Sequence, residues 1–246
     1  MHAHDASRLR GKTALVIGAT GGIGYHTALG LADEGAALSL HGRSEERLAA
    51  VRAAVEGHGA ECRTIAQDLT AAEDVVPVID AAPPVDVLVI AYGPFLEKPV
   101  LDTSPEEWRH LHDMNVVLPA LVFSRLLPSM IERGFGRVVV FGGTGTHRVS
   151  GYRNIAAYRA EKTALGGLVK SAAREAAGSD VAVNAVCPGP VDTEYLSEAQ
   201  RRRFRRLLPG GEMPTPGQIV PHVLSLIIQD SPLMNGALVP LDGGMT

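Results

Sequence analysis

Residues 13–24 read TALVIGATGGIG, so an apolar run, residues 13–17, passes directly into a glycine-rich turn, residues 18–24. The run has the length of a buried strand. Residues 25–34 then carry apolar side chains at helical spacing and end before Gly35. A strand joined to a helix by a short glycine turn is the first unit of a parallel α/β sheet. The stretch therefore predicts that the chain begins with such a unit.

The glycines of this turn have separate roles. Gly18 permits a tight strand-to-helix turn, Gly22 leaves room for a pyrophosphate, and Gly24 lets the helix pack closely on the strand. The start of the helix offers unpaired N–H groups and a partial positive charge to phosphates. The turn therefore predicts a dinucleotide site; the alternative is a glycine-rich turn that binds nothing.

The same alternation of strands and helices continues along the chain. Further strands are expected at residues 37–41, 63–66, 86–91, 137–141, 181–186 and 238–241. Helices are expected at residues 44–58, 72–81, from 103 or 104 to 132 with a bend near Pro119, 156–177 and 219–229. This order predicts one doubly wound Rossmann-type α/β domain over residues 1–246, with a parallel sheet covered by helices on both faces. Residues 190–216 are expected to form a lid-like insertion.

Composition narrows the class of protein. The 246 residues are 46% hydrophobic and 20% charged with a net charge of −4, which gives no indication of nucleic-acid binding. Cys62 and Cys187 lack metal-type or redox-type spacing. Residues 1–10 lack the apolar region of a signal peptide, and the apolar runs, such as residues 87–91, are too short to span a membrane. We therefore expect a cytoplasmic protein with no metal and no membrane association.

The end of the second strand bears on the choice of cofactor. A site that selects NAD usually places a carboxylate here to bind the ribose 2′-hydroxyl, but no acid occupies residues 41–44. Gly42 stands near the expected acid, and the guanidinium of Arg43 suits a 2′-phosphate. This favours NADP(H), although the nearby Glu45 and Glu46 leave NAD(H) open.

Residues 158–162, YRAEK, place Tyr158 and Lys162 four residues apart, on one face of a helix. A neighbouring ammonium favours the phenolate and so lowers the pKa of the phenol. Such a pair can donate a proton to a carbonyl oxygen or accept one in reverse. Alone, a Tyr four residues before a Lys is more often an ordinary amphipathic helix face than a catalytic pair.

Taken together, these motifs resemble the classical short-chain dehydrogenase/reductase family from Lys12 to Gly244. The resemblance also rests on Asp68 after the third strand, Asn115 in the central helix, residues 184–193 (NAVCPGPVDT) and residues 242–244 (DGG). It implies Tyr158 as acid–base residue, Lys162 lowering its pKa and holding the nicotinamide ribose, and Asn115 anchoring a water in a proton relay. The cofactor-binding residues that the turn and the resemblance indicate are Gly18, Thr20, Gly21, Gly22, Ile23, Gly24, Arg43, Ser44, Asp68, Leu69, Ala91, Tyr92, Gly93, Tyr158, Lys162, Pro188, Gly189, Val191 and Thr193.

Three positions depart from the family pattern. Ile17 replaces a Thr that helps to hold the glycine turn. Residues 90–93 read IAYG where the fourth strand usually ends in Asn-Asn-Ala-Gly, so the stabilising Asn is missing and Tyr92 adds a ring that either lines the pocket or packs under a helix. Gly143 stands in place of the catalytic Ser that hydrogen-bonds the substrate carbonyl. We hypothesise that Thr144 supplies that hydroxyl, with Thr146 as the alternative.

The sequence thus predicts an NADP(H)-dependent oxidoreductase that interconverts a ketone or 3-oxoacyl-type carbonyl and a secondary alcohol. A catalytically weakened dinucleotide-binding sensor or scaffold is the main alternative, and a dehydratase or epimerase without net redox is a third. The resemblance also implies a homotetramer paired through the helices at residues 104–132 and 156–177, where Ala160, Ala164, Gly166 and Gly167 allow close approach.

Overall fold

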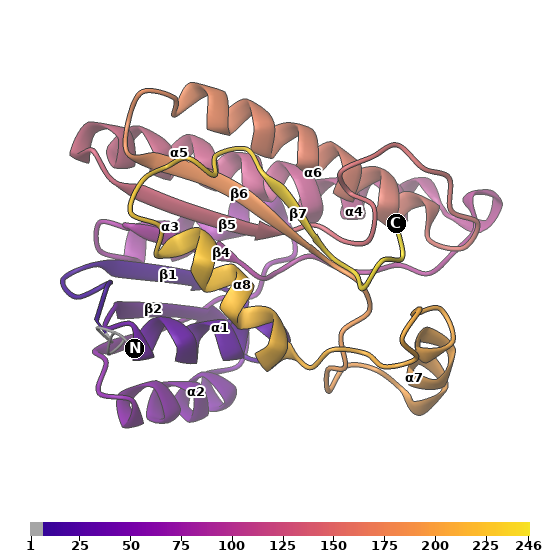
Figure 1. Cartoon of the computed structure of the whole chain (residues 1–246), viewed down its shortest axis with the longest axis horizontal. Coiled ribbons are helices and arrows are strands. Elements are labelled where there is room, and N and C mark those ends of the chain that lie inside the picture. The colour runs from indigo at the N-terminus through magenta and orange to yellow at the C-terminus, as the bar shows by residue number, and fades with distance from the viewer. Residues whose placement is uncertain (1–6) are drawn as a thin grey trace.

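The computed structural model describes residues 7–246, which form one seven-stranded parallel sheet with helices on both faces (Figure 1). The strand order is β3-β2-β1-β4-β5-β6-β7, with the reversal between β1 and β4 that creates a crevice at the carboxyl ends of the strands. The strands are β1 (Thr13–Ile17), β2 (Ala37–Gly42), β3 (Cys62–Ala66), β4 (Val87–Ile90), β5 (Gly136–Phe141), β6 (Val181–Pro188) and β7 (Leu238–Leu241). The predicted Rossmann-type fold is confirmed.

Alternate residues of the central strands enter two separate apolar cores. Leu15 and Leu88 belong to the core under α3, α5 and α6, whereas Val16 and Val89 belong to the core under α1, α2 and α8. The helices are α1 (Gly22–Asp33), α2 (Glu45–Gly57), α3 (Val76–Ala81), α4 (Pro105–His112), α5 (Leu118–Arg133), α6 (Ala156–Glu175), α7 (Glu198–Arg205) and α8 (Pro216–Ile227). In Figure 1, α1 and α8 lie on the near side of the sheet, and α5 and α6 cover the opposite side.

The long central helix differs from the expectation in the position of its irregular turn. Ser104 caps α4 and forms a capping box with Glu107, as the sequence suggests. The irregularity is a π-helical turn at Asp113–Val117, ahead of Pro119, which sits without strain in the first turn of α5. The expected helix at residues 72–81 is a 3₁₀ turn, Ala72–Val75, followed by the short α3.

By length and composition, the continuous helical run Pro105–Arg133 is capable of crossing a membrane, with a mean hydropathy of 1.5 over its most apolar part. Its apolar side chains Leu118, Val122 and Phe123 are buried against the sheet. Core helices of water-soluble proteins share this composition, so the run gives only weak indication of a membrane span.

Residues 190–216 lie beyond the end of β6, and their only regular element among the described residues is α7. In Figure 1, this segment projects from the body of the sheet at the carboxyl ends of the strands. The guanidinium of Arg203 forms an ion pair with Glu97, with 2.7 Å between Nη2 and Oε2, and Arg201 pairs with Asp192 at 2.6 Å. The segment is thus held next to the loop that follows β4.

Candidate active site

The glycine turn has the geometry that its residues suggest. Gly18 has a φ of +87°, and its N–H and that of Ala19 both donate to the carbonyl of His41. A Cβ on Gly24 would overlap the carbonyl oxygen of Gly18, so the start of α1 packs directly on the turn. The turn brings the positive end of α1 to the carboxyl edge of the sheet, where the crevice lies.

A carboxylate occupies the start of α1. Oε1 of Glu194 accepts a hydrogen bond of 3.0 Å from the backbone N–H of Gly22. The neighbouring side chains of Thr193 and Tyr195 lie over the same glycine, at 3.6 and 3.4 Å from where its Cβ would be. The helix start therefore binds an anion in this structure, and the carboxylate stands where a pyrophosphate oxygen of a dinucleotide would fit.

The end of β2 has no room for a side chain at position 42. A Cβ on Gly42 would overlap the Cγ2 methyl group of Thr20. Arg43 is exposed directly after β2, and the Ser44 hydroxyl caps α2 by accepting from the N–H of Arg47. Asp68 is exposed after β3. The position where a 2′-hydroxyl-binding acid would stand is thus closed by Thr20, while a guanidinium is free beside it.

The two departures near β4 are accommodated by other contacts. The carbonyl of Ile17 accepts a 2.8 Å hydrogen bond from the N–H of Ala91, which ties the turn to β4 without a hydroxyl. The Tyr92 ring packs against the apolar core, and its Oη donates to the Leu69 carbonyl at 3.0 Å. Of the two alternatives for Tyr92, the structure shows the packing one, because its side chain joins the end of β4 to the residues after β3.

Tyr158 and Lys162 lie on the same face of α6, as predicted, at the ends of β4 and β5. Lys162 Nζ donates to the carbonyl of Phe141 at 2.8 Å and lies 5.6 Å from the centre of the Tyr158 ring. Phe95 packs edge-on against Tyr158 with 4.9 Å between ring centres. The Tyr158 phenol faces the cavity next to Gly143.

Burial governs the ionisation of this pair. It raises the pKa of Tyr158 to about 12, so the expected lowering by Lys162 is wrong: the loss of solvent outweighs the opposing positive charge, which here comes from Arg159. It lowers the pKa of Lys162 to about 8. At neutral pH the phenol therefore holds its proton and most of the lysine is charged. Such a phenol is a proton donor.

Asn115 lies in the π-helical turn, buried beside Lys162. Its Nδ2 donates to the carbonyls of Leu111 and Pro94, at 3.0 and 3.2 Å, and its Oδ1 has no hydrogen-bond partner among residues 7–246. A Cβ on Gly93 would lie 2.6 Å from that Oδ1 and 3.1 Å from Lys162 Nζ. The absence of a side chain at Gly93 leaves a polar space between the amide and the ammonium, which suits a bridging water.

The loop after β5 has two hydroxyls with different surroundings. Thr146 is buried, and its Oγ1 accepts from the N–H of Gly143 at 2.9 Å, so it holds the loop rather than facing substrate. Thr144 lines the cavity. A Cβ on Gly143 would lie 3.3 Å from Tyr158 Oη and 3.4 Å from Arg159 Nη1, so the space of the missing Ser borders a phenol and a guanidinium.

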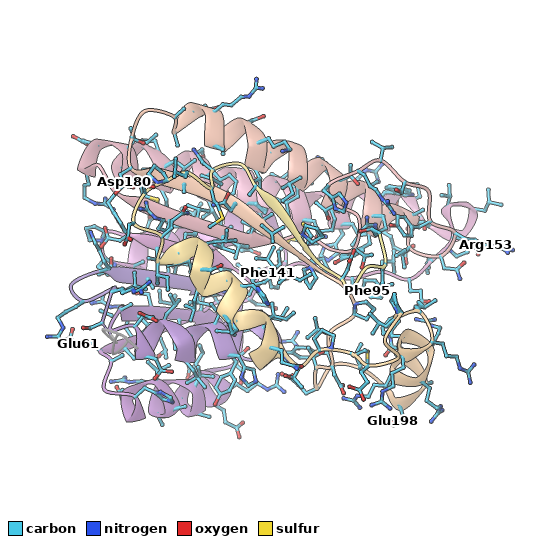
Figure 2. The ribbon with its side chains drawn as sticks, viewed as in Figure 1. Glu61, Phe95, Phe141, Arg153, Asp180 and Glu198 are labelled. Atoms are coloured by element: carbon cyan, nitrogen blue, oxygen red, sulfur yellow. The ribbon has the colours of Figure 1, made fainter. Side chains whose placement is uncertain are left out.

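Gly143, Thr144, Tyr158 and Arg159 line a cavity of about 720 Å³ at the carboxyl edge of the sheet. Its lining includes Pro188, the last residue of β6, with Gly189 and Val191 after it, and a set of large apolar side chains. These are Phe95, Ile155, Leu196, Phe204, Leu207 and Met245. Figure 2 shows Phe95 close to the ends of the strands, whereas Arg153 points outward at the edge of the molecule. Arg159, Phe95 and Glu194 were not expected in the site from the sequence.

Comparisons with known proteins agree with this geometry. The family model described as enoyl-(acyl carrier protein) reductase matches residues 18–246. The chain is 32% identical to the 3-oxoacyl-[acyl-carrier-protein] reductase FabG of Aquifex aeolicus, over 97% of this chain and 98% of that one. It is 30% identical to the glucose 1-dehydrogenase of Gluconobacter oxydans, over 100% and 96%.

Solved structures of reductases also match this chain over nearly its whole length. A 3-oxoacyl (acyl-carrier-protein) reductase of Agrobacterium tumefaciens, with NADP bound, superposes with a TM-score of 0.86 at 32% identity, over 96% of this chain and 95% of that one. Levodione reductase superposes with a TM-score of 0.87 at 27% identity, over 96% and 98%. The resemblance in sequence and the resemblance in fold both cover nearly the whole chain.

Proposed function

Because the chain belongs to the classical short-chain dehydrogenase/reductase family, we propose that it is an NADP(H)-dependent oxidoreductase that interconverts a carbonyl compound and a secondary alcohol. The observation that carries this proposal is the position of Tyr158. Its phenol opens into the cavity beside Lys162, at the carboxyl edge of the sheet that also bears the glycine turn.

The residues present fit a dinucleotide, as the binding of the Glu194 carboxylate at Gly22 indicates. The glycine turn would hold the pyrophosphate, Arg43 the 2′-phosphate, and Lys162 the nicotinamide ribose. The preference for NADP(H) rests on the closed position at Gly42, the exposed guanidinium of Arg43, and the NADP bound to a related reductase. When bound, the nicotinamide would supply a hydride to the carbonyl carbon in reduction, or accept one from the alcohol carbon in oxidation.

The chain's own residues handle the proton. In reduction, the phenol of Tyr158 donates its proton to the substrate oxygen, and the charge of Lys162 stabilises the phenolate that remains. A water between Lys162 and Asn115 would return a proton through the polar space beside Gly93. Thr144 lines the cavity and is the hydroxyl available to hydrogen-bond the substrate oxygen in place of the missing Ser.

The sensor alternative rests on the loss of that Ser and of the usual Asn near β4. It assigns no role to a buried lysine next to a phenol that opens into a cavity. We therefore favour catalysis. Consumption of one NADPH for each product molecule would exclude a dehydratase or epimerase, which has no net redox change.

We also propose that the chain assembles as a homotetramer through α4, α5 and α6. On α6, Ala160, Ala164 and Gly167 are exposed small residues on one face, which supports close approach of a second helix. Gly166 instead faces inward, where its Cβ would meet Leu238 and Thr146. Light scattering at micromolar concentration tests the assembly, and a monomer would contradict it.

The function is tested by adding a panel of ketones and oxoacyl compounds to the protein with NADPH and following NADPH absorbance. Tyr158→Phe should lower kcat by about 10²- to 10⁴-fold and leave NADPH binding, followed by fluorescence, nearly unchanged. Tyr25→Phe makes the same chemical change on α1, outside the cavity, and should leave kcat unaffected. Binding of NADPH without turnover of any compound, with Tyr158→Phe identical to the wild type, would favour the sensor.

A further inference from the structure

Arg159 is the buried cation of the cavity wall that has no opposite charge beside it. The residue is 4% exposed, and its Nε and Nη1 have no hydrogen-bond partner in the part of the chain that the structure describes. Nη2 makes one long contact, 3.5 Å, to the hydroxyl of Tyr152, whose ring stacks against the guanidinium at 4.4 Å. No carboxylate among residues 7–246 forms an ion pair with it. A buried guanidinium in this state is costly, because it has lost its water without gaining a counter-charge.

The other charged groups of residues 7–246 form no ion pair with Arg159, and this includes the C-terminal residue Thr246, whose Cγ2 lies 3.5 Å from where a Cβ of Gly145 would be. Of the three charged residues that line the cavity, Glu97 and Arg203 pair with each other. Glu161, two residues further along α6, pairs with His112 at 2.8 Å on another side of the helix. Among the described residues that line it, the cavity therefore has one positive charge without an ion-pair partner, that of Arg159, within otherwise largely apolar walls.

Two glycines of the loop after β5 make the space for this guanidinium. A Cβ on Gly145 would lie 2.8 Å from Arg159 Nη2 and 2.7 Å from the Tyr152 hydroxyl. At Gly143, a Cβ would lie within 3.4 Å of both Arg159 Nη1 and the Tyr158 hydroxyl. The guanidinium and the proton-donating phenol thus border one small space that is free of side-chain atoms.

We propose that Arg159 binds a carboxylate of the substrate, attached to the reacting carbonyl carbon directly or through one carbon, so that the substrates are 2-oxo or 3-oxo acids and the corresponding hydroxy acids. This inference rests on the proposed function, because it places the carbonyl oxygen at Tyr158. A single carboxylate balances the single charge, whereas a phosphate monoester would bring nearly two. The shared space beside Gly143 fixes the short separation between the two groups, and the apolar walls accept the rest of the substrate.

The test compares acids with their own esters. Initial rates of NADPH oxidation are measured with 2-oxo-4-phenylbutanoate, 3-oxohexanoate and the ethyl ester of each. The wild type should prefer at least one of the acids to its ester by about 30-fold or more in kcat/KM. Arg159→Met should abolish that preference while it changes the rate on the ester by less than about threefold. Arg148→Met changes an exposed arginine in the loop between β5 and α6, and this variant should keep the preference for the acid.

A binding measurement separates this inference from the function itself. Calorimetry with 4-phenylbutanoate, which has no carbonyl to reduce, is carried out at saturating NADP⁺. Binding by the wild type and the Arg148→Met variant, but not by Arg159→Met, supports the inference even if no carbonyl compound is turned over. The Tm of Arg159→Met should be no lower than that of the wild type, since the substitution removes a buried, unpaired charge.

Three results would overturn the proposal. The first is equal use of each acid and its ester by the wild type. The second is a loss of rate in Arg159→Met that is the same for acids and esters, which would make the guanidinium a donor to the carbonyl oxygen. The third is that calorimetry detects no binding of 4-phenylbutanoate to the wild type. In the first two results the protein still reduces carbonyl compounds. Failure of the carboxylate-binding proposal is therefore distinguishable from failure of the proposed function.

Discussion

The Oε1 atom of Glu194 lies 3.0 Å from the backbone nitrogen of Gly22, at the N-terminus of α1. A carboxylate of the chain thus stands where the helix dipole and the free N–H groups attract an anion. A dinucleotide bound there has to displace it, so the carboxylate competes with the cofactor.

We predict that Glu194→Gln lowers the Kd for NADPH by about three- to tenfold, because a neutral amide binds the helix start more weakly than a carboxylate. Fluorescence titration of NADPH measures the change. Glu198→Gln, on the exposed side of α7, is the matched control. An unchanged or higher Kd in Glu194→Gln would mean that the carboxylate moves away without cost, or that it assists binding.

Thr20 and Gly42 together exclude a side chain from the end of β2. We predict that Gly42→Asp alone weakens binding of both cofactors, because the new Cβ overlaps Thr20 Cγ2. The double variant Thr20→Ser, Gly42→Asp lacks that methyl group, and it should prefer NADH to NADPH by at least about tenfold in kcat/KM.

Arg43→Ala tests whether the guanidinium contributes to the preference for NADPH. Loss of the guanidinium should raise the KM for NADPH by about ten- to a hundredfold and leave the KM for NADH within about twofold. Equal effects on both cofactors would show that Arg43 does not contact a 2′-phosphate.

The fold was predictable because its signals are local. Residues 13–24 contain the strand, the turn and the helix start in one continuous stretch, and alternate residues of each strand enter the two cores. The bend of the central helix was placed too late, at Pro119, because a proline is visible in sequence. The π-helical turn that surrounds Asn115 depends instead on packing and on the bonds of its amide to Leu111 and Pro94.

Arg159 was not predictable in the same way. An arginine on an amphipathic helix is usually solvated, and its burial here depends on Gly143 and Gly145, which precede it by more than a dozen residues. The signal that was available is the run of small residues at positions 142–145, where the family pattern expects a Ser. Only in the folded chain does the space left by the missing Ser side chain at Gly143 lie next to the guanidinium of Arg159.

Tyr92 gives a prediction about stability rather than catalysis. Its hydroxyl donates to the Leu69 carbonyl, and Tyr92→Phe leaves that carbonyl without this donor. The free energy of unfolding should fall by about 1 kcal/mol, measured by urea titration. The Kd for NADPH should change by less than about twofold. Unchanged stability with a large loss of cofactor affinity would instead make the tyrosine part of the cofactor site.

The last prediction concerns pH. Burial lowers the pKa of Lys162 from its ordinary value to about 8, so the ammonium loses its proton as pH rises through about 8, while Tyr158, with a pKa of about 12, keeps its own. A neutral lysine stabilises the phenolate less, and kcat for reduction at saturating NADPH should therefore fall above about pH 8. In Lys162→Arg the cation persists to higher pH, so the decline should move upward by at least about one pH unit even though kcat is lower. Lys170→Arg, at an exposed position of the same helix, should leave the profile unchanged. A decline at the same pH in Lys162→Arg would assign the titration to another group, and a flat profile to about pH 10 would show that the charge of Lys162 does not assist the proton transfer.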